Sequence, residues 1–189
     1  MAGHGHGHGD HGGNKSIALL IAVLALFLAL AETGAKSAQT EALARNIEAA
    51  NLWAFFQART IRQTTVRTAA EEAALGLVGL EDATRRAAIE RQIAGWRATA
   101  DRWESEPQTG EGRRELMNRA REAERRRERS MSAYHMYEYG SAAFQVAIVL
   151  ASASIVTGVP LLAVIGGVLG VIGMGLSGLG FFAPELIHL

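Results

Sequence analysis

The residues best suited to metal chemistry lie at the N-terminus, where histidine alternates with glycine. The four histidines of this segment are His4, His6, His8 and His11. In an extended chain, side chains two residues apart project to the same side, about 6–7 Å from one another. Imidazole nitrogens bind Zn, Ni or Cu ions, and the carboxylate of Asp10 could add an oxygen ligand. We therefore interpret residues 1–15 as a candidate metal-binding tail, with a weakly chelating low-complexity segment or an expression tag as the alternative.

No other segment predicts a catalytic centre. The chain contains no cysteine, which excludes disulfide frameworks, thiolate metal sites and cysteine nucleophiles. Gly173, Gly175 and Gly178 match the dinucleotide-binding fingerprint by letter, but they lie in an apolar segment that follows no predicted strand. His135 stands among tyrosines and is expected to be an interfacial residue. We therefore expect a protein that is not an enzyme.

The distribution of charge indicates a membrane protein with a charged middle segment. All but four of the charged residues lie between Lys36 and Glu138, and the stretches 16–31 and 141–184 contain none. The 19 basic and 19 acidic residues balance, which argues against a nucleic-acid partner. Long uncharged apolar stretches predict membrane-spanning helices. The predicted fold is therefore an all-α membrane protein with three transmembrane helices and a long antiparallel, coiled-coil-like helical stalk between the first and the second.

The first transmembrane helix is expected at residues 16–35. Its apolar run, Ile17–Ala31, rises about 22 Å as a helix, which is near the lower limit for crossing a membrane. Lys15 before the run and small residues at its end also fit a cleavable signal peptide. We favour an uncleaved anchor.

The second and third transmembrane helices, residues 139–158 and 161–183, are expected to form a tight hairpin, followed by a short tail at 184–189. Small residues recur on both helices at intervals of three or four. They are Ala143, Ala147 and Ala151 on the second helix, and Gly166, Gly170, Gly173 and Gly180 on the third. Small residues let helices approach closely in lipid. The two stripes could pack within the hairpin, between protomers, or both, and the glycines off the stripe at 167, 175 and 178 could serve a second contact.

The middle segment, residues 36–138, is predicted to be a helical stalk. One long helix is expected to run out to about Leu75, and two helices to return, at about 81–104 and from Arg113 without a break into the second span. Their lengths nearly match at a rise of about 1.5 Å per residue. The first helix carries an apolar stripe at Leu43, Ile47, Ala50 and Ala54. The aromatic residues expected in the core or between protomers are Trp53, Phe55, Phe56, Trp96 and Trp103.

Basic residues near the predicted spans indicate the orientation. The stalk side offers Lys36, Arg45 and the arginines between 121 and 129, whereas the other side offers only Lys15. The positive-inside rule therefore places the stalk in the cytoplasm and the N-terminal tail outside.

Three stretches of the sequence resemble a bacterial membrane protein family, that of domain of unknown function 4337. They are AETGAKS at 31–37 within the stretch 17–44, NLWAFFQARTIR at 51–62, and YHMYEYGSAA at 134–143. The resemblance covers nearly the whole chain after the tail. It implies a protein of the bacterial inner membrane with three spans. The histidine-rich N-terminus also resembles N-termini in that family. It implies no activity, so no functional residue is transferred.

We expect the chain to be a non-enzymatic, homo-oligomeric membrane scaffold whose partners are its own copies, membrane lipid and a cytoplasmic protein. The alternative is a homo-oligomeric ion channel in which the second transmembrane helix lines a pore through Gln145, Ser152 and Thr157. A third hypothesis is metal sensing or buffering by the histidine tail.

Overall fold

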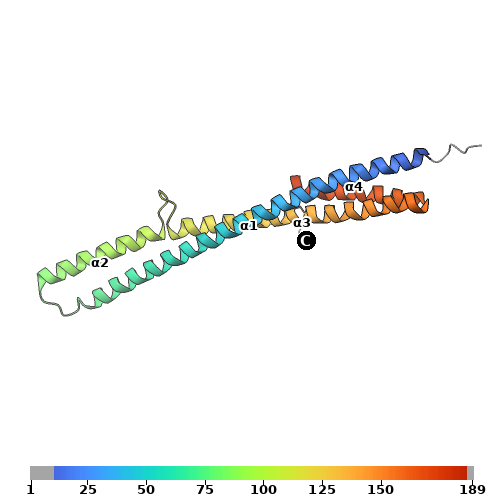
Figure 1. Ribbon diagram of the computed structural model, residues 1–189. Helices are drawn as coiled ribbons and strands as arrows, with labels where there is room; N and C mark the ends of the chain where they lie inside the picture. The colour runs from blue at the N-terminus through green and yellow to red at the C-terminus, as the bar shows by residue number, and fades with distance from the viewer. Residues whose placement is uncertain (1–10, 187–189) are drawn as a thin grey trace, which may run out of the picture. The chain divides into compact units, whose positions relative to one another are not determined.

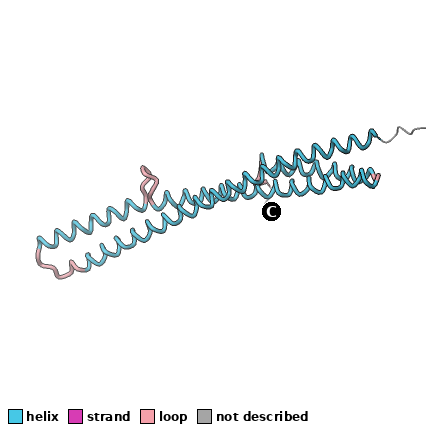
Figure 2. The backbone as a smooth tube through the Cα atoms, in the orientation of Figure 1, coloured by secondary structure: helices cyan, strands magenta, loops and turns pink. Residues whose placement is uncertain are grey.

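The computed structural model describes residues 11–186, with side chains from residue 14 onward. These residues form four helices and no strand: α1 (His11–Leu75), α2 (Ala83–Glu104), α3 (Arg113–Thr157) and α4 (Pro160–Phe182). Figures 1 and 2 show their order along the chain. The prediction of an all-α chain is therefore confirmed. Helices α1, α3 and α4 are long and apolar enough to cross a membrane.

The long helices persist because their sequences contain few residues that interrupt a helix. Between Asn14 and Leu75, α1 contains a single glycine, Gly34, and no proline. Helix α3 likewise continues from Arg113 to Thr157 without proline, as expected.

Helix ends coincide with local capping signals. After α1, Gly79 adopts a φ of 77°, a conformation that favours glycine. Asp82 then caps α2, because its carboxylate accepts hydrogen bonds from the amides of Thr84 (2.9 Å) and Arg85 (3.1 Å). The cap explains why α2 begins at Ala83, two residues later than expected.

The turn between α3 and α4 consists of two residues, Gly158 and Val159. Gly158 has a φ of 69°, and Pro160 occupies the first turn of α4, where its missing amide costs nothing. The hydroxyl of Ser154 donates to the carbonyl of Val159 at 2.8 Å and closes the turn.

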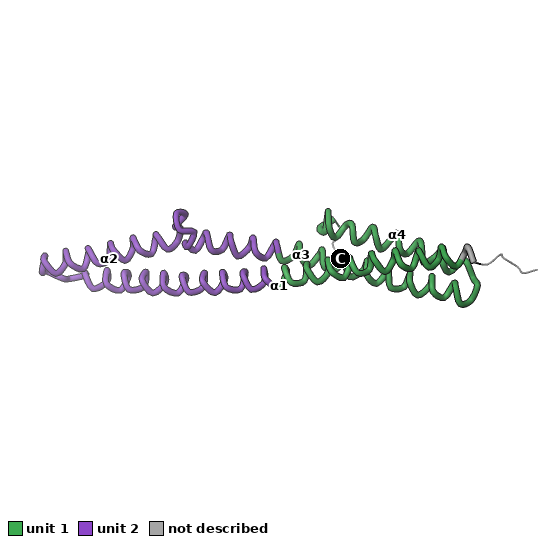
Figure 3. The backbone as a smooth tube through the Cα atoms, turned by 45° about the horizontal axis from the view of Figure 1, so that its top comes forward, with its two compact units in different colours: residues 1–43, 127–189 green, residues 44–126 purple. Residues whose placement is uncertain are grey.

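The chain forms two compact units (Figure 3). Unit 1 comprises residues 1–43 and 127–189, and unit 2 comprises residues 44–126. The core of unit 1 joins Leu24 and Ala31 of α1 to Phe144 and Ala147 of α3. The rings of Phe27 and Phe144 stack there, with centroids 6.0 Å apart. Unit 1 is thus held together by contacts between helices that are distant in sequence.

Unit 2 pairs α1 with α2 and with the first turns of α3 in an antiparallel arrangement. Trp53 bonds Glu124, whereas Gln63, farther along α1, bonds the carbonyl of Ala100. Residue numbers on the partner helices therefore fall as those on α1 rise. The apolar core joins Ala49 and Leu52 of α1 to Leu116, Ala120 and Ala123 of α3.

The apolar stripe predicted on α1 is not the one that the fold buries. Leu43, Ile47, Ala50 and Ala54 are all exposed. The buried positions follow a neighbouring stripe, Ala49, Leu52, Arg59 and Gln63, which includes two polar residues. Contacts with α2 and α3, rather than hydrophobicity along α1, decide which face points inward.

Candidate functional site

A partly buried polar layer lies in unit 2 where α2 ends and α3 begins, opposite α1. We define it as Arg59 and Gln63 of α1, Glu104 of α2 and Arg113 of α3. Arg59 is 8% exposed and Gln63 is 2% exposed. Helix α2 ends at Glu104 and α3 begins at Arg113, and these two residues form an ion pair of 2.8 Å across the connecting loop, residues 105–112.

Gln63 is the centre of this polar layer. Its Nε2 donates to the carbonyl of Ala100 at 2.8 Å and to Oε2 of Glu104 at 3.0 Å. Its Oε1 accepts from Nη1 of Arg113 at 2.9 Å. The same Arg113 nitrogen lies 2.8 Å from Oε2 of Glu104. The buried amide therefore has its oxygen and its nitrogen bonded, as burial requires.

The surroundings of Glu104 favour its charged form. The hydrogen bond from Gln63, together with the charge and hydrogen bond of Arg113, holds the pKa of the Glu104 carboxyl below its ordinary value, against the opposing effect of burial. The carboxylate is therefore more stable in the folded unit than in an unfolded chain.

Arg59 extends the polar layer toward the loop. Its Nη2 lies 2.8 Å from Oε2 of Glu111, and its guanidinium lies 5.4 Å from the ring centroid of Phe55 and 5.9 Å from that of Trp103. Its buried Nε has no hydrogen-bond partner among residues 14–186. Arg59 thus links α1 to the end of α2 and to the loop that follows it.

The loop after α2 is closed by Glu115. This carboxylate accepts from the Ser105 hydroxyl at 2.7 Å and from the Glu106 amide at 3.1 Å. Gly112 is required for the closure, because a Cβ at this position would overlap Oε2 of Glu115 and the amide nitrogen of Glu106 and would lie 2.8 Å from Cα of Ser105.

The chemistry of the polar layer is structural. Its charged groups are paired: Glu104 lies within 4 Å of Arg113 and Arg114, and Arg59 lies 2.8 Å from Glu111 in the loop. Buried polar pairs of this kind act best in setting the register between helices. We therefore interpret the layer as the feature that aligns α2 and α3 along α1.

Two of the five predicted aromatic residues pack together against the apolar core of unit 2. Trp53 and Phe56 meet edge to face, with centroids 5.4 Å apart, and Trp53 Nε1 donates to Glu124 at 2.8 Å. Phe55 is 37% exposed. Trp103 lies near Arg59, and Trp96 is half-buried on α2.

The predicted glycine stripe of α4 packs inside unit 1. Gly166, Gly170, Gly173 and Gly180 are all buried. A Cβ on Gly166 would lie 2.8 Å from the carbonyl oxygen of Ala147, and one on Gly173 would lie 3.0 Å from the ring of Phe144. A Cβ on Gly170 would overlap Leu24 of α1, and one on Gly180 would lie 3.1 Å from Cβ of Met136. The stripe thus lets α4 approach both α1 and α3.

The alanine stripe of α3 packs against the glycine stripe of α4. Ala147 and Ala151 are completely buried, and Ala143 is half-buried. The glycines off the stripe differ, because a Cβ on Gly167, Gly175 or Gly178 would meet no atom of the described chain within 4 Å. Three glycines of α4 therefore lie on open surface.

None of the three residues predicted to line a pore, Gln145, Ser152 and Thr157, is fully buried. Gln145 is exposed, and its Nε2 makes one long hydrogen bond, 3.4 Å, to the hydroxyl of Ser141. Ser152 is half-buried. Thr157 is exposed, and its hydroxyl donates to the carbonyl of Ala153 at 2.8 Å.

The predicted metal ligands cannot be located. His4, His6 and His8 lie outside the described residues, and the side chain of His11 is likewise not described. Elsewhere in the described part of the chain, no group of three or more His, Asp or Glu side chains could hold a metal ion.

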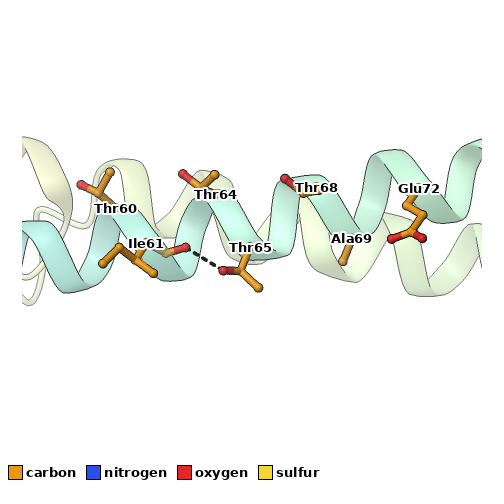
Figure 4. A pocket seen from close by; sticks show the side chains of 7 residues that line it. All are labelled: Thr60, Ile61, Thr64, Thr65, Thr68, Ala69 and Glu72. Atoms are coloured by element: carbon orange, nitrogen blue, oxygen red, sulfur yellow. Dashed lines mark hydrogen bonds between the residues drawn. The ribbon is translucent and has the colours of Figure 1, made fainter.

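A shallow pocket lies on the surface of unit 2, along a threonine-rich part of α1 (Figure 4). It is lined by Thr60, Ile61, Thr64, Thr65, Thr68, Ala69 and Glu72. Neither this pocket nor the polar layer was recognised from the sequence. The sequence does contain a pattern that indicates the layer. Arg59 and Gln63 continue the side of the helix that begins with Leu52 and Phe56, at intervals of three and four residues.

Comparison with known proteins identifies the family. No curated protein and no solved structure matches the chain. A family model described as domain of unknown function DUF4337 matches residues 13–183, which include all four helices except the first two residues of α1. The chain therefore belongs to the DUF4337 family.

Proposed function

We propose that this protein is a non-enzymatic, homo-oligomeric scaffold of the bacterial inner membrane. In this proposal, the apolar parts of α1, α3 and α4 in unit 1 cross the membrane, and unit 2 forms a helical stalk in the cytoplasm. The basic residues that flank the apolar segments on the unit 2 side support this orientation. The extensive pairing of charged side chains in unit 2 supports a structural role for the stalk.

The observation that carries the proposal is the exposed side chain of Gln145. It lies six residues, about 9 Å, beyond Tyr139 in a stretch of α3 that contains no charged residue. Among the described residues, the hydrogen bond from its amide to the hydroxyl of Ser141 is long, at 3.4 Å. An amide that faces hydrocarbon loses its hydrogen bonds to water, at a cost of several kcal/mol. A second copy of the chain can supply the missing partner, because glutamine commonly bonds across transmembrane helices.

The small residues of α4 provide the second support. Gly167, Gly175 and Gly178 have no neighbour on their open side, so another helix could approach them closely. The buried glycines, by contrast, are already used for packing within the chain. Residues inside unit 1 therefore build the protomer, and residues on its open surface are those available for assembly.

The test is the native mass of the full-length protein in lipid nanodiscs, for wild type, Gln145→Leu and the control Val149→Leu. Val149 is also exposed on α3, but it is apolar. We expect wild type and the control to form the same oligomer. Removing one interhelical hydrogen bond costs about 0.6–2 kcal/mol, so Gln145→Leu should weaken association roughly 3- to 30-fold. A monomeric wild type, or equal dissociation of the two variants, would contradict the proposal.

A channel is the second candidate function, because the same side chain could face water in a pore. Gln145 and Ser152 are separated by seven residues and therefore lie on one side of α3. The two candidates differ in ion flux across liposomes. A channel should conduct in the wild type and conduct less after Gln145→Leu, whereas a scaffold should show no flux in either.

A further inference from the structure

The outward side of α1 in unit 2 carries a continuous surface without charge. We define this uncharged face as six exposed positions spaced by three and four: Ile47, Ala50, Ala54, Gln57, Ile61 and Thr64. As a helix these positions extend about 26 Å. The charged residues of the same stretch, such as Glu48 and Arg62, lie on other sides of the helix. The uncharged face is thus a separate surface within a unit that is densely charged.

The uncharged face is exposed in the described part of the chain. Leu52, Phe56, Arg59 and Gln63, which make the contacts with α2 and α3, lie on the other side of α1. Ile47 is 54% exposed and Ile61 is 67% exposed. Ile47 and Ile61 lie on the same side of the helix with the small residues Ala50 and Ala54 between them, a pattern that suits packing against another helix.

We propose that the uncharged face binds the same face of a second copy, so that two α1 helices pack in parallel. This inference rests on the proposed function, since copies inserted in one membrane with one topology have α1 running in the same direction. In a parallel pair related by a two-fold axis, each residue lies near its own copy. A charge on this face would be repelled by its counterpart, and the face has none.

The composition of the face suits such a pair. Alternating intervals of three and four are the spacing of a two-stranded coiled coil. Ala50 and Ala54 allow the two backbones to approach closely. Gln57, the one amide among the six positions, can bond its own copy, as polar residues in coiled-coil seams do when they set the register.

The pocket continues the uncharged face along α1 as far as Ala69, and Glu72 marks the far end of the pocket, beyond the uncharged face. In Figure 4, Thr60, Thr64 and Thr68 follow one another along α1, beside Ile61 and Thr65. The Thr65 hydroxyl donates to the carbonyl of Ile61 at 2.9 Å. Because its polar atom is bonded to the helix itself, this side chain can be covered by a partner at little cost. The pocket can therefore receive a side chain of the second helix.

Disulfide trapping tests this proposal directly, because the chain has no cysteine of its own. The full-length variants Ala54→Cys and Ala98→Cys are oxidised with copper phenanthroline in membranes. Ala98 is the control, since it is an exposed alanine on α2, away from the uncharged face. We expect Ala54→Cys, and not Ala98→Cys, to give a disulfide-linked species at twice the 20.2 kDa mass of the chain.

A charge variant supplies the second measurement. Ile61→Glu changes an exposed residue, so the protomer should fold as before, but it places like charges opposite each other in the pair. When introduced with Ala54→Cys, it should reduce the trapped dimer at least threefold, and Ile61→Ser should reduce it less.

The outcomes separate this inference from the proposed function. A wild-type oligomer in nanodiscs with no more trapping at Ala54→Cys than at Ala98→Cys would overturn the inference alone. Trapping to a species of another mass would assign the face to a different protein and would also overturn it. A monomeric wild type would overturn both proposals.

Discussion

Adding one methyl group at Gly166 should separate two helices of unit 1, whereas the same change at Gly167 should not. A Cβ on Gly166 would lie 2.8 Å from the carbonyl oxygen of Ala147 and 3.4 Å from the backbone nitrogen of Ala151. Both atoms belong to the backbone of α3, so relief requires a shift of a whole helix. A Cβ on Gly167 would meet no described atom within 4 Å.

The magnitude follows from two opposing terms. Replacing glycine by alanine within a helix stabilises it by up to about 1 kcal/mol, and this term is common to both variants. Overpacking a close contact costs typically about 1–3 kcal/mol, and this term applies to Gly166→Ala alone. We therefore expect Gly166→Ala to be less stable than Gly167→Ala by about 1–3 kcal/mol.

The assay is reversible unfolding of each full-length variant in mixed micelles with increasing sodium dodecyl sulfate, followed by circular dichroism. Comparing the two variants removes the helix-propensity term, so the difference in unfolding free energy reports the contact between α4 and α3. Equal unfolding free energies, or a more stable Gly166→Ala, would refute the close approach of the two backbones.

Two predictions concern unit 2. The pKa of the Glu104 carboxyl in the folded protein lies below its ordinary value of 4.5, so the ionised carboxylate stabilises the fold. This stabilisation should be complete well above pH 4.5 and lost as the pH falls through the folded pKa. Glu104→Gln should therefore show a smaller loss of unfolding free energy in acid than wild type, and an identical acid dependence would contradict this. Gly112→Ala should displace the Glu115 carboxylate and destabilise the unit by about 1–3 kcal/mol in thermal unfolding. The control is Gly95→Ala, whose Cβ would meet no described atom within 4 Å, so this variant should be neutral or stabilising. Equal melting temperatures for Gly112→Ala and Gly95→Ala would count against the role of Gly112.

The helices and their ends follow from local sequence. Glycines after Leu75, the Asp82 cap and Pro160 at the start of α4 act within one or two turns, so their effect does not depend on distant residues. Apolar composition is also a local property, and it correctly indicates which helices are apolar enough to cross a membrane. The resemblance in three short motifs was sufficient to predict the family, which the match over residues 13–183 confirms.

Helix contacts are harder to predict from sequence. The glycine stripe of α4 indicated a close helix contact, but not that it meets both α1 and α3 or that Gly167 lies open. Spacing shows only which residues share a side of a helix. The partner on that side depends on the arrangement of the helices in space.

The inward face of α1 was decided by tertiary structure alone. Both sides of α1 carry apolar residues, Ile47 and Ile61 on one side and Leu52 and Phe56 on the other, yet the side with Ile47 and Ile61 is exposed. The side with Gln63 is buried because Glu104 and Arg113, 41 and 50 residues farther along the chain, supply its hydrogen bonds. A polar side chain is costly to bury only while it lacks partners. Since those partners come from other helices, the sequence of α1 shows two usable faces, and the packing of unit 2 selects one and leaves the other free.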